Sequence, residues 1–353
     1  MELHTIGIDL GKSVFHLVGL NLRGEVVVRK KFSRRQLLQF TANLQVDWMG
    51  MEACGGAHFL GRALREQGHQ VRLMPAQYVK PYVKTNKNDF IDAEAIAEAV
   101  ARPTMRFVPI KTDEQLDMQS LHRVRESWVI RRTAIVNQIR GLLLERGITL
   151  PKGRHHVDAA LPGILEDGDA KLSGPLRTLL TQLKLELDQM AMRVDQADAV
   201  LNKTAHENDA CQRLVAIPGI GPVTATALIA AIGNGAAFRK GRDFAAWIGV
   251  TPREHSTGGK QRLLGISKRG NSYLRRLFIQ GARAVLQQRT KQNPGLSAWL
   301  AQLTGRAHAN VAAVALANKL ARIAWAVLAK DEPYRPVAPA NDRSLTGLQM
   351  SPG

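Results

Sequence analysis

An α/β domain followed by a mostly helical C-terminal region is the fold class that the sequence predicts. In the first third of the 353-residue chain, short apolar runs alternate with helical patterns, whereas the patterns from residue 112 onward are largely helical. A hydrophobic content of 45% and a charged content of 22% are typical of a globular protein. A chain of this length can form more than one domain.

Three β-rich segments come first. The predicted strands lie at residues 4–11, 14–20 and 25–32. The turn residues Asn21 to Gly24 separate the second strand from the third, so a meander is expected. Helices at 34–44 and 57–68 then alternate with strands at 46–53 and 70–76. A meander followed by alternating helices and strands is the element order of a ribonuclease H-like fold.

Acidic residues stand at the ends of elements in this predicted domain. Asp9 closes the first strand, and Glu52 closes the strand that follows the meander. Asp89 and Asp92 head an alanine-rich helical pattern, three residues apart and therefore on one helical face. Asp is also favoured at helix starts for local reasons, so Asp89 is expected to cap this helix, to bind a metal ion, or to do both.

Together the four acids predict a metal site. In a ribonuclease H-like sheet the first strand lies beside the strand after the meander, and the helix from Asp89 packs next to that edge. One or two Mg²⁺ ions would balance the carboxylates and assist displacement at a phosphodiester. Asp9 in "IGIDLGKS" also resembles the first phosphate motif of sugar-kinase and chaperone ATPases, but the chain lacks a recognisable second glycine-rich phosphate loop.

The middle of the chain is predicted to contain a long basic helix at 112–144 and a loop-rich break at 151–175, where His155 and His156 are expected to be solvated. Apolar residues spaced alternately four and three apart follow: Leu176, Leu180, Leu183, Leu187, Met190, Val194, Ala197 and Leu201. This heptad predicts a coiled-coil helix that joins copies of the chain. The alternative is an amphipathic helix that packs on its own domain.

A glycine-rich turn marks the C-terminal region. Gly219 and Gly221 lie between two apolar helical patterns within residues 216–233. Such a turn resembles a helix-hairpin-helix element, in which backbone N–H groups contact a DNA phosphate. The alternative is a tight interhelical turn that needs only the backbone freedom of glycine.

The net charge is strongly basic. A formal charge of +19 indicates a polyanionic partner, and it favours nucleic acid over an anionic membrane. The residues expected to contact phosphates are Arg253, Lys260, Arg262, Lys268, Arg269, Arg275 and Arg276. No uninterrupted apolar stretch approaches the length of a membrane span, and Cys54 and Cys211 lack a metal-ligand spacing, so a cytoplasmic protein is expected.

Several stretches of the chain resemble the DEDD insertion-sequence transposases, which are RNA-guided bridge recombinases. In the first domain these are "IGIDLGK" with Asp9, "GMEACGG" with Glu52, and "NKNDFIDAEAIAE" with Asp89 and Asp92. In the second half they are "IPGIGPVTATALIAAIG", a long string that includes "HSTGGK" and "LLGISKRG", and "LARIAWAVL". The resemblance follows the chain in order and misses mainly the tail.

This resemblance implies a mechanism. A RuvC-like domain would use the four acids with Mg²⁺, and a serine of the second domain would form a covalent serine–DNA intermediate. The two domains would build a composite site, and a structured noncoding RNA would pair with donor and target DNA. Ser256 is the matching nucleophile, Thr257 is the alternative, and Ser267 is a third candidate. A turn residue that bonds its own backbone is the non-catalytic interpretation of Ser256.

The predicted organisation has four parts. These are a RuvC-like domain with the long basic helix (1–150), a loop and coiled-coil linker (151–205), a C-terminal transposase domain (206–331) and a disordered tail (332–353). The predicted function is a transposase or recombinase that acts as a homo-oligomer, a dimer or a tetramer. The alternatives are a RuvC-type Mg²⁺-dependent endonuclease that uses only the acids, and a nucleic-acid-binding protein without catalysis.

Overall fold

The computed structural model describes residues 2–84, 88–168, 172–288 and 294–336, and the chain divides into two compact units, Met1–Asp113 and Glu114–Gly353. The first unit holds a mixed five-stranded sheet with the strand order β3-β2-β1-β4-β5. Its strands are β1 (Thr5–Leu10), β2 (Phe15–Leu20), β3 (Val26–Phe32), β4 (Trp48–Glu52) and β5 (Val71–Met74). The first three strands are antiparallel, and β4 and β5 run parallel to β1, which confirms the predicted meander.

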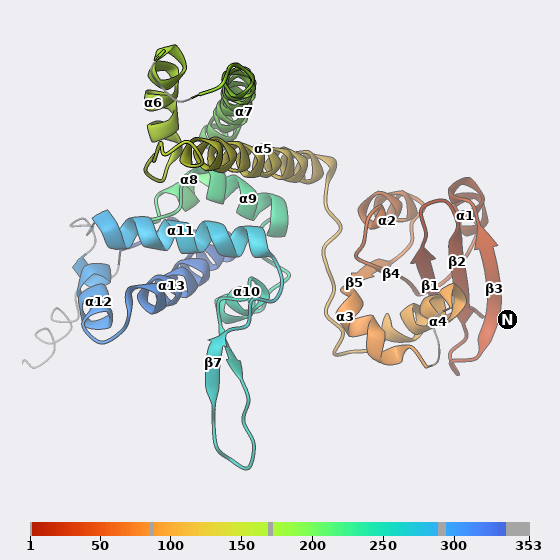
Figure 1. The fold of residues 1–353 in the computed structure, drawn as a ribbon. Coiled ribbons are helices and arrows are strands. Elements are labelled where there is room, and N and C mark those ends of the chain that lie inside the picture. The colour runs from red at the N-terminus through yellow and green to blue at the C-terminus, as the bar shows by residue number, and fades with distance from the viewer. Residues whose placement is uncertain (1, 85–87, 169–171, 289–293, 337–353) are drawn as a thin grey trace, which may run out of the picture. The chain divides into compact units, whose positions relative to one another are not determined.

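Helices cover both faces of this sheet (Figure 1). One face carries α1 (Arg34–Thr41) and α2 (Ala57–Glu66), and the other carries α4 (Asp89–Ala99), which follows the short helices α3 (Ala76–Val79) and η1 (Lys80–Tyr82). Ile6 and Ile8 of β1 are buried with α1 and α2, whereas Gly7 faces α4. A Cβ atom at Gly7 would lie 2.0 Å from the Ala93 carbonyl oxygen, so α4 approaches β1 this closely only because residue 7 is glycine.

The second unit is almost entirely helical. Its helices are α5 (Asp113–Leu144), α6 (Arg154–Glu166), α7 (Gly174–Glu207), α8 (Asp209–Val215), α9 (Pro222–Ile232), α10 (Gly241–Trp247), α11 (Ser272–Gln288), α12 (Pro294–Thr304) and α13 (Ala309–Lys330). One core, which includes Phe244 and Phe278, joins α8, α9, α10, α11 and α13. An antiparallel pair, β6 (Pro252–Glu254) and β7 (Leu263–Ile266), projects from the α10 region as a hairpin (Figure 1).

The long helix α5 packs with the second unit. Ile135, Ile139 and Leu143 are buried together with residues of α6 and α7. The compact units therefore divide at residue 113, whereas the sequence places a domain boundary at residue 150. The observed division and the predicted boundary differ because α5 buries its apolar side against later helices. The sequence of α5 alone does not reveal which helices it contacts.

The predicted loop at 151–175 is wrong for the thirteen residues Arg154–Glu166, which form α6. His155 and His156 therefore lie on a helix. Val157 and Leu161, four residues apart, are fully buried in the core shared with α5 and α7. This burial stabilises the helix although Pro162 lies inside it.

The heptad residues of α7 are packed inside the second unit. Leu180, Leu187 and Leu201 have no exposed surface. The N-terminal half of the seam shares a core with α5 and α6. An amphipathic helix that packs on its own domain makes contacts of this kind, and a coiled coil between copies of the chain stays a prediction.

The C-terminal helix α13 is long and apolar enough to cross a membrane by length and composition, and it alone meets that test in the part of the chain that the structure describes. This stretch is not an uninterrupted apolar run, because Lys319 and Arg322 lie within it. Half of its most apolar window is buried inside the protein, where Leu316 and Leu320 pack in the core of the second unit. In the predicted disordered tail, Tyr334 packs against this core, and residues 337–353 lie outside the described residues.

Candidate active site: a carboxylate edge and a serine hairpin

Strand register brings Asp9 and Glu52 to one end of the sheet, on the face that α4 covers. β1 and β4 are parallel, with Ile8 paired with Met51, so Asp9 and Glu52 come next on neighbouring strands. Two residues earlier, Gly7 and Gly50 lie directly under α4 and its C-terminal cap. Because side chains alternate along a strand, Asp9 and Glu52 point to the same face as these two glycines.

The first turn of α4 adds Asp89 and Asp92. Asn88 caps this helix, because its Oδ1 accepts a hydrogen bond from the Phe90 N–H at 2.9 Å. The predicted capping role of Asp89 is therefore wrong. Asp89 is the first helical residue, and its carboxylate is not needed to satisfy the helix start.

Asp9, Glu52, Asp89 and Asp92, which we call the carboxylate edge, repel one another. Burial raises the pKa of Asp9, and the charges of Asp89 and Asp92 raise it further. Burial and the charges of Asp9 and Asp92 likewise raise the pKa of Glu52. Asp9 therefore lies within electrostatic reach of the other three acids, in an excess of negative charge.

The donor set of the carboxylate edge fits a hard divalent cation. Mg²⁺ prefers carboxylate oxygens, and its charge would relieve the repulsion that raises these pKa values. In the described ranges, however, no three His, Cys, Asp or Glu side chains lie close enough together to hold one ion. The chemistry of the edge thus supports the predicted metal site, although the side chains have not converged on one point.

The hairpin formed by β6, β7 and the turn between them, residues 252–266, is called the serine hairpin here. Ser256 is exposed, and its Oγ donates a hydrogen bond to Glu254 Oε1 at 2.6 Å. Gln261 Nε2 donates to the same oxygen at 3.3 Å. Ser256 is therefore an accessible alcohol whose proton is directed at a carboxylate, an arrangement that suits a nucleophile.

The other two hydroxyl candidates have different surroundings. Thr257 closes the hairpin turn, because its backbone exchanges two hydrogen bonds with Lys260. Ser267 follows β7, and its Oγ is buried without a hydrogen-bond partner. A buried hydroxyl cannot reach a DNA phosphate in this conformation, whereas Ser256 is open to solvent.

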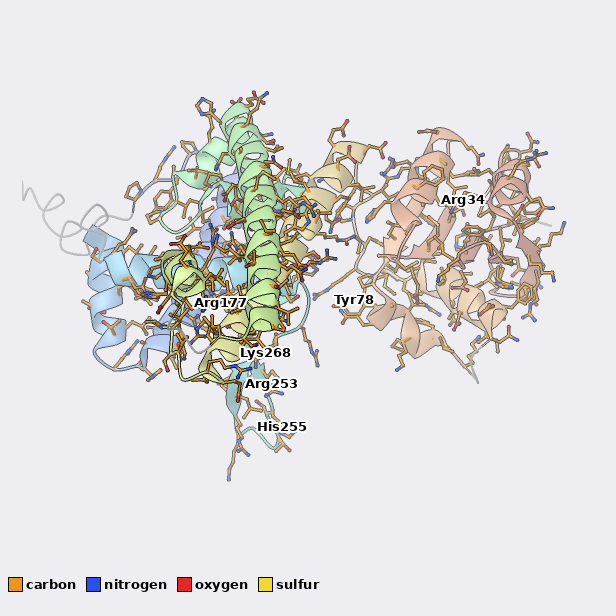
Figure 2. The ribbon with its side chains drawn as sticks, turned by 45° about the horizontal axis from the view of Figure 1, so that its top comes forward. Arg34, Tyr78, Arg177, Arg253, His255 and Lys268 are labelled. Carbon is orange, nitrogen blue, oxygen red and sulfur yellow. The ribbon has the colours of Figure 1, made fainter. Side chains whose placement is uncertain are left out.

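The basic residues predicted to contact phosphates fall into two groups. The exposed group lies on the serine hairpin and just after it, and it comprises Arg253, Lys260, Arg262, Lys268 and Arg269. Figure 2 labels Arg253 and Lys268 of this group. The other group has partners inside the second unit. Arg275 Nη1 donates to the carbonyl oxygens of Ile248 and Arg269 at 3.0 and 2.8 Å. Arg276 forms an ion pair with Glu126 at 2.6 Å.

The glycine turn between α8 and α9 has a packing role. Gly219 has a φ of 84° and lies against α11, where a Cβ atom at Gly281 would be 2.0 Å from the Gly219 carbonyl oxygen. Gly221, the N-cap of α9, is exposed, and a Cβ atom there would meet nothing within 4 Å. Packing accounts for Gly219, and Gly221 is the better placed of the two for a backbone contact to a phosphate.

Known proteins match both regions. A family model described as "Transposase IS116/IS110/IS902 family" matches residues 211–295, and a transposase model of the IS110 DEDD type matches residues 6–147. A "Probable family 20 transposase" of Pseudomonas aeruginosa is 48% identical, over 95% of this chain and 100% of its own length. The chain belongs to the IS110/IS116 transposase family. It is an insertion-sequence enzyme of DNA transposition, as the sequence predicts.

Two further relatives of this transposase cover nearly its whole length. The transposase for insertion sequence element IS1328 of Yersinia enterocolitica is 45% identical, over 91% of this chain and 96% of its own. The transposase for IS1111A of Coxiella burnetii is 42% identical, over 95% and 92% respectively. The carboxylate edge lies within one matched family region and the serine hairpin within the other.

Sequence reasoning missed two residues beside the transposase's candidate groups. His16 pairs directly with Asp9 across β1 and β2, and the short connection from Gly11 to Val14 could have given that register. Glu254 stands two residues before Ser256 in a strand-like segment, and residues two apart in a strand share a face.

Proposed function

We propose that this transposase cuts and rejoins DNA through a covalent serine–DNA intermediate on Ser256, assisted by Mg²⁺ at the carboxylate edge. The observation that carries the proposal is the 2.6 Å hydrogen bond from Ser256 Oγ to Glu254 Oε1 on an exposed basic hairpin. An alcohol that attacks phosphorus needs a proton acceptor and neutralisation of the phosphate charge. Glu254 supplies the first, and the basic residues of the serine hairpin supply the second.

In the proposed step, Ser256 Oγ attacks a DNA phosphorus atom and its proton passes to Glu254. The Oγ–P bond forms while the bond from phosphorus to a deoxyribose oxygen breaks, and that oxygen leaves as a hydroxyl after taking up a proton. Rejoining is the reverse reaction with another strand: a DNA hydroxyl attacks the phosphorus, and Ser256 regains its proton. Each step exchanges one phosphate ester for another, so no external energy source is needed.

The carboxylate edge would hold one or two Mg²⁺ ions through Asp9, Glu52, Asp89 and Asp92. Bound Mg²⁺ would polarise the phosphate and stabilise the attacking or departing oxygen. In this arrangement β1 and β4 present two of the carboxylates, and the first turn of α4 presents the other two. Because the backbone positions of these four residues are fixed, only their side chains would have to move for the site to bind an ion.

Donor and target DNA are the proposed substrates, and a structured noncoding RNA is the proposed guide. A net charge of +19 attracts the phosphate backbones of both. Arginine and lysine on the serine hairpin, with the backbone N–H groups at Gly221 in a helix-hairpin-helix-like turn, would hold phosphates without reading bases. Base pairing with the RNA would choose the sequence. We place the reaction in the bacterial cytoplasm, at the nucleoid.

Assembly into a dimer or a tetramer is part of the proposal. Because the heptad seam of α7 is packed inside its own unit, a second copy would use another side of the helix. Leu185 and Met192, seven residues apart, are 60% and 54% exposed. Leu185→Glu is expected to lower the molar mass measured by light scattering, and an unchanged mass would place the contact elsewhere.

A denaturing protein gel tests the serine chemistry. Purified protein is incubated with Mg²⁺, the noncoding RNA that flanks the element, and labelled donor and target DNA. We expect a DNA-linked protein band that is lost in Ser256→Ala and kept in Thr257→Ala. A band that survives Ser256→Ala would refute the assigned nucleophile. Cleaved DNA without linked protein, dependent on Asp9 and Glu52 but not on Ser256, would identify a RuvC-type endonuclease instead.

A further inference from the structure

A histidine lies beside the carboxylate edge. His16 is on β2, and strand pairing places it directly opposite Asp9. Directly opposed residues of an antiparallel pair point to the same face, so the imidazole faces the site under α4. His16 Nδ1 lies 3.6 Å from Asp89 Oδ2.

The imidazole of His16 is held in place, but its Nδ1 atom is unsatisfied. The side chain is only 15% exposed, and the ring packs edge to face against Phe90 with centroids 4.7 Å apart. The buried Nδ1 atom has no hydrogen-bond partner. An unsatisfied buried polar group destabilises a fold, so such an atom in a native structure calls for an explanation.

The distance between His16 Nδ1 and Asp89 Oδ2 is slightly too long for a hydrogen bond, and such a bond would form if the two side chains moved closer when an ion binds. A hydrogen bond of this type spans about 2.7–3.2 Å, so a movement of roughly half an ångström would form it. The acids of the carboxylate edge have not converged on one point, and a bound cation would draw them inward. Phe90 adjoins Asp89 in the chain, so the ring contact also fixes His16 relative to the start of α4.

We propose that His16 is a positioning residue of the metal site, whose Nδ1–H donates to Asp89 Oδ2 and holds that carboxylate toward a bound divalent cation. The inference rests on the proposed Mg²⁺ site and adds a group that the four acids do not include. Mg²⁺ prefers oxygen ligands, so His16 acts through Asp89 rather than on the ion. Partners of this kind orient ligands in metal sites.

Mn²⁺ binding to the full-length protein, measured by isothermal titration calorimetry without nucleic acid, tests this role. We expect the wild-type protein to bind Mn²⁺ and the Asp92→Asn variant not to bind it. His16→Ala is expected to weaken Mn²⁺ binding about 10–100-fold, as removal of such partners typically does. His16→Asn places an amide N–H near the Nδ1 position and should restore most of the affinity. His16→Gln, whose amide reaches the Nε2 position instead, should not.

His4→Ala is the matched control. His4 precedes β1 at the other end of the same sheet, where its Nδ1 lies 2.6 Å from Asp47 Oδ2, and its loss should leave Mn²⁺ affinity unchanged. Melting of the metal-free variants separates a binding defect from unfolding. If His16→Ala does not fold, His16→Gln takes its place as the variant expected to lose affinity.

Each outcome of the titration has a separate meaning. Wild-type affinity in His16→Ala would overturn the inference and leave the metal site intact. A loss in His16→Ala that His16→Asn does not rescue would overturn the role of Nδ1. A wild-type protein that binds no Mn²⁺, or binding that survives Asp92→Asn, would overturn the proposed metal site itself and this inference with it.

Discussion

The carboxylate edge and the serine hairpin position their reactive groups in opposite ways. Asp9 and Glu52 end two strands under α4, and their positions follow from strand register and from the close approach of that helix. All residues of β6 are exposed, and the Ser256 side chain is oriented by a hydrogen bond to Glu254. A packed scaffold holds like charges together at a cost in stability, whereas an exposed hairpin keeps an alcohol accessible at little cost.

Asp9→Asn tests the packed side of this comparison with the largest expected effect. DNA strand transfer should fall by at least about 10³-fold, because several kcal/mol of metal-assisted stabilisation are lost. In the absence of metal, the Asp9→Asn protein should melt at a higher temperature than the wild-type protein. The raised pKa of Asp9 means that the folded state holds the proton more tightly than the unfolded state, so ionised Asp9 destabilises the fold at neutral pH and stability rises as pH falls through that pKa.

Calorimetry at several pH values and a strand-transfer assay measure both effects. Asp117→Asn, on an exposed position of α5, is the control and should change neither. A metal-free Asp9→Asn protein that melts below the wild type would show that the carboxylate edge is not under electrostatic strain.

Glu254→Gln tests the exposed side. The rate of covalent-adduct formation should fall about 10²–10⁴-fold, the usual contribution of one positioned proton acceptor, while the melting temperature stays unchanged. Single-turnover kinetics across pH measure the rate. Gln261→Ala removes the other hydrogen bond to Glu254 and should have a much smaller effect. A wild-type rate in Glu254→Gln would leave Ser256 without its assigned base.

The two regions also differ in how far the sequence predicts them. The acids of the carboxylate edge are predictable because β-strand periodicity and element order fix which residues end at the same sheet edge. The partners of Arg275 and Arg276 are tertiary contacts, which spacing along the chain does not encode. The seam of α7 is ambiguous for a physical reason: three-four spacing serves packing within a unit and pairing between copies equally well.

The helix α6 is not predicted because local sequence signals point to a loop. Gly153 and Pro162 are strong loop indicators in the sequence, and they conceal the apolar pair Val157 and Leu161. Burial of that pair against α5 and α7 outweighs the local preferences.

Arg262→Ala tests whether the hairpin charges bind phosphate. The slope of the logarithm of DNA affinity against the logarithm of salt concentration should decrease by about 1, with a few-fold weaker binding for any sequence. Fluorescence anisotropy over a salt series measures the slope. Arg276→Ala removes a charge that is already paired with Glu126 and should change the slope less. Equal changes in both variants would show that exposure on the hairpin gives no advantage.

Lys268→Gly has the smallest expected effect. Lys268 follows the serine hairpin with a φ of 54°, a left-handed conformation that is unfavourable for a side chain with a Cβ atom. Glycine should stabilise the fold by up to about 1 kcal/mol, and DNA affinity should fall because the charge is lost. Denaturant unfolding measures the stability. Lys268→Ala loses the same charge and keeps the left-handed conformation at a residue with a Cβ atom. An equal gain in the free energy of unfolding in Lys268→Ala would show that backbone strain at residue 268 is not the cause.

The central claim is that the carboxylate edge and the serine hairpin serve one reaction, and the most direct test is the serine–DNA band in Asp92→Asn. With guide RNA, both DNA substrates and Mg²⁺ present, we expect that this variant, folded and bound to DNA, forms no covalent band although Ser256 and Glu254 are intact. A band at the wild-type level in Asp92→Asn would show that the serine acts without the carboxylates, and it would contradict the claim.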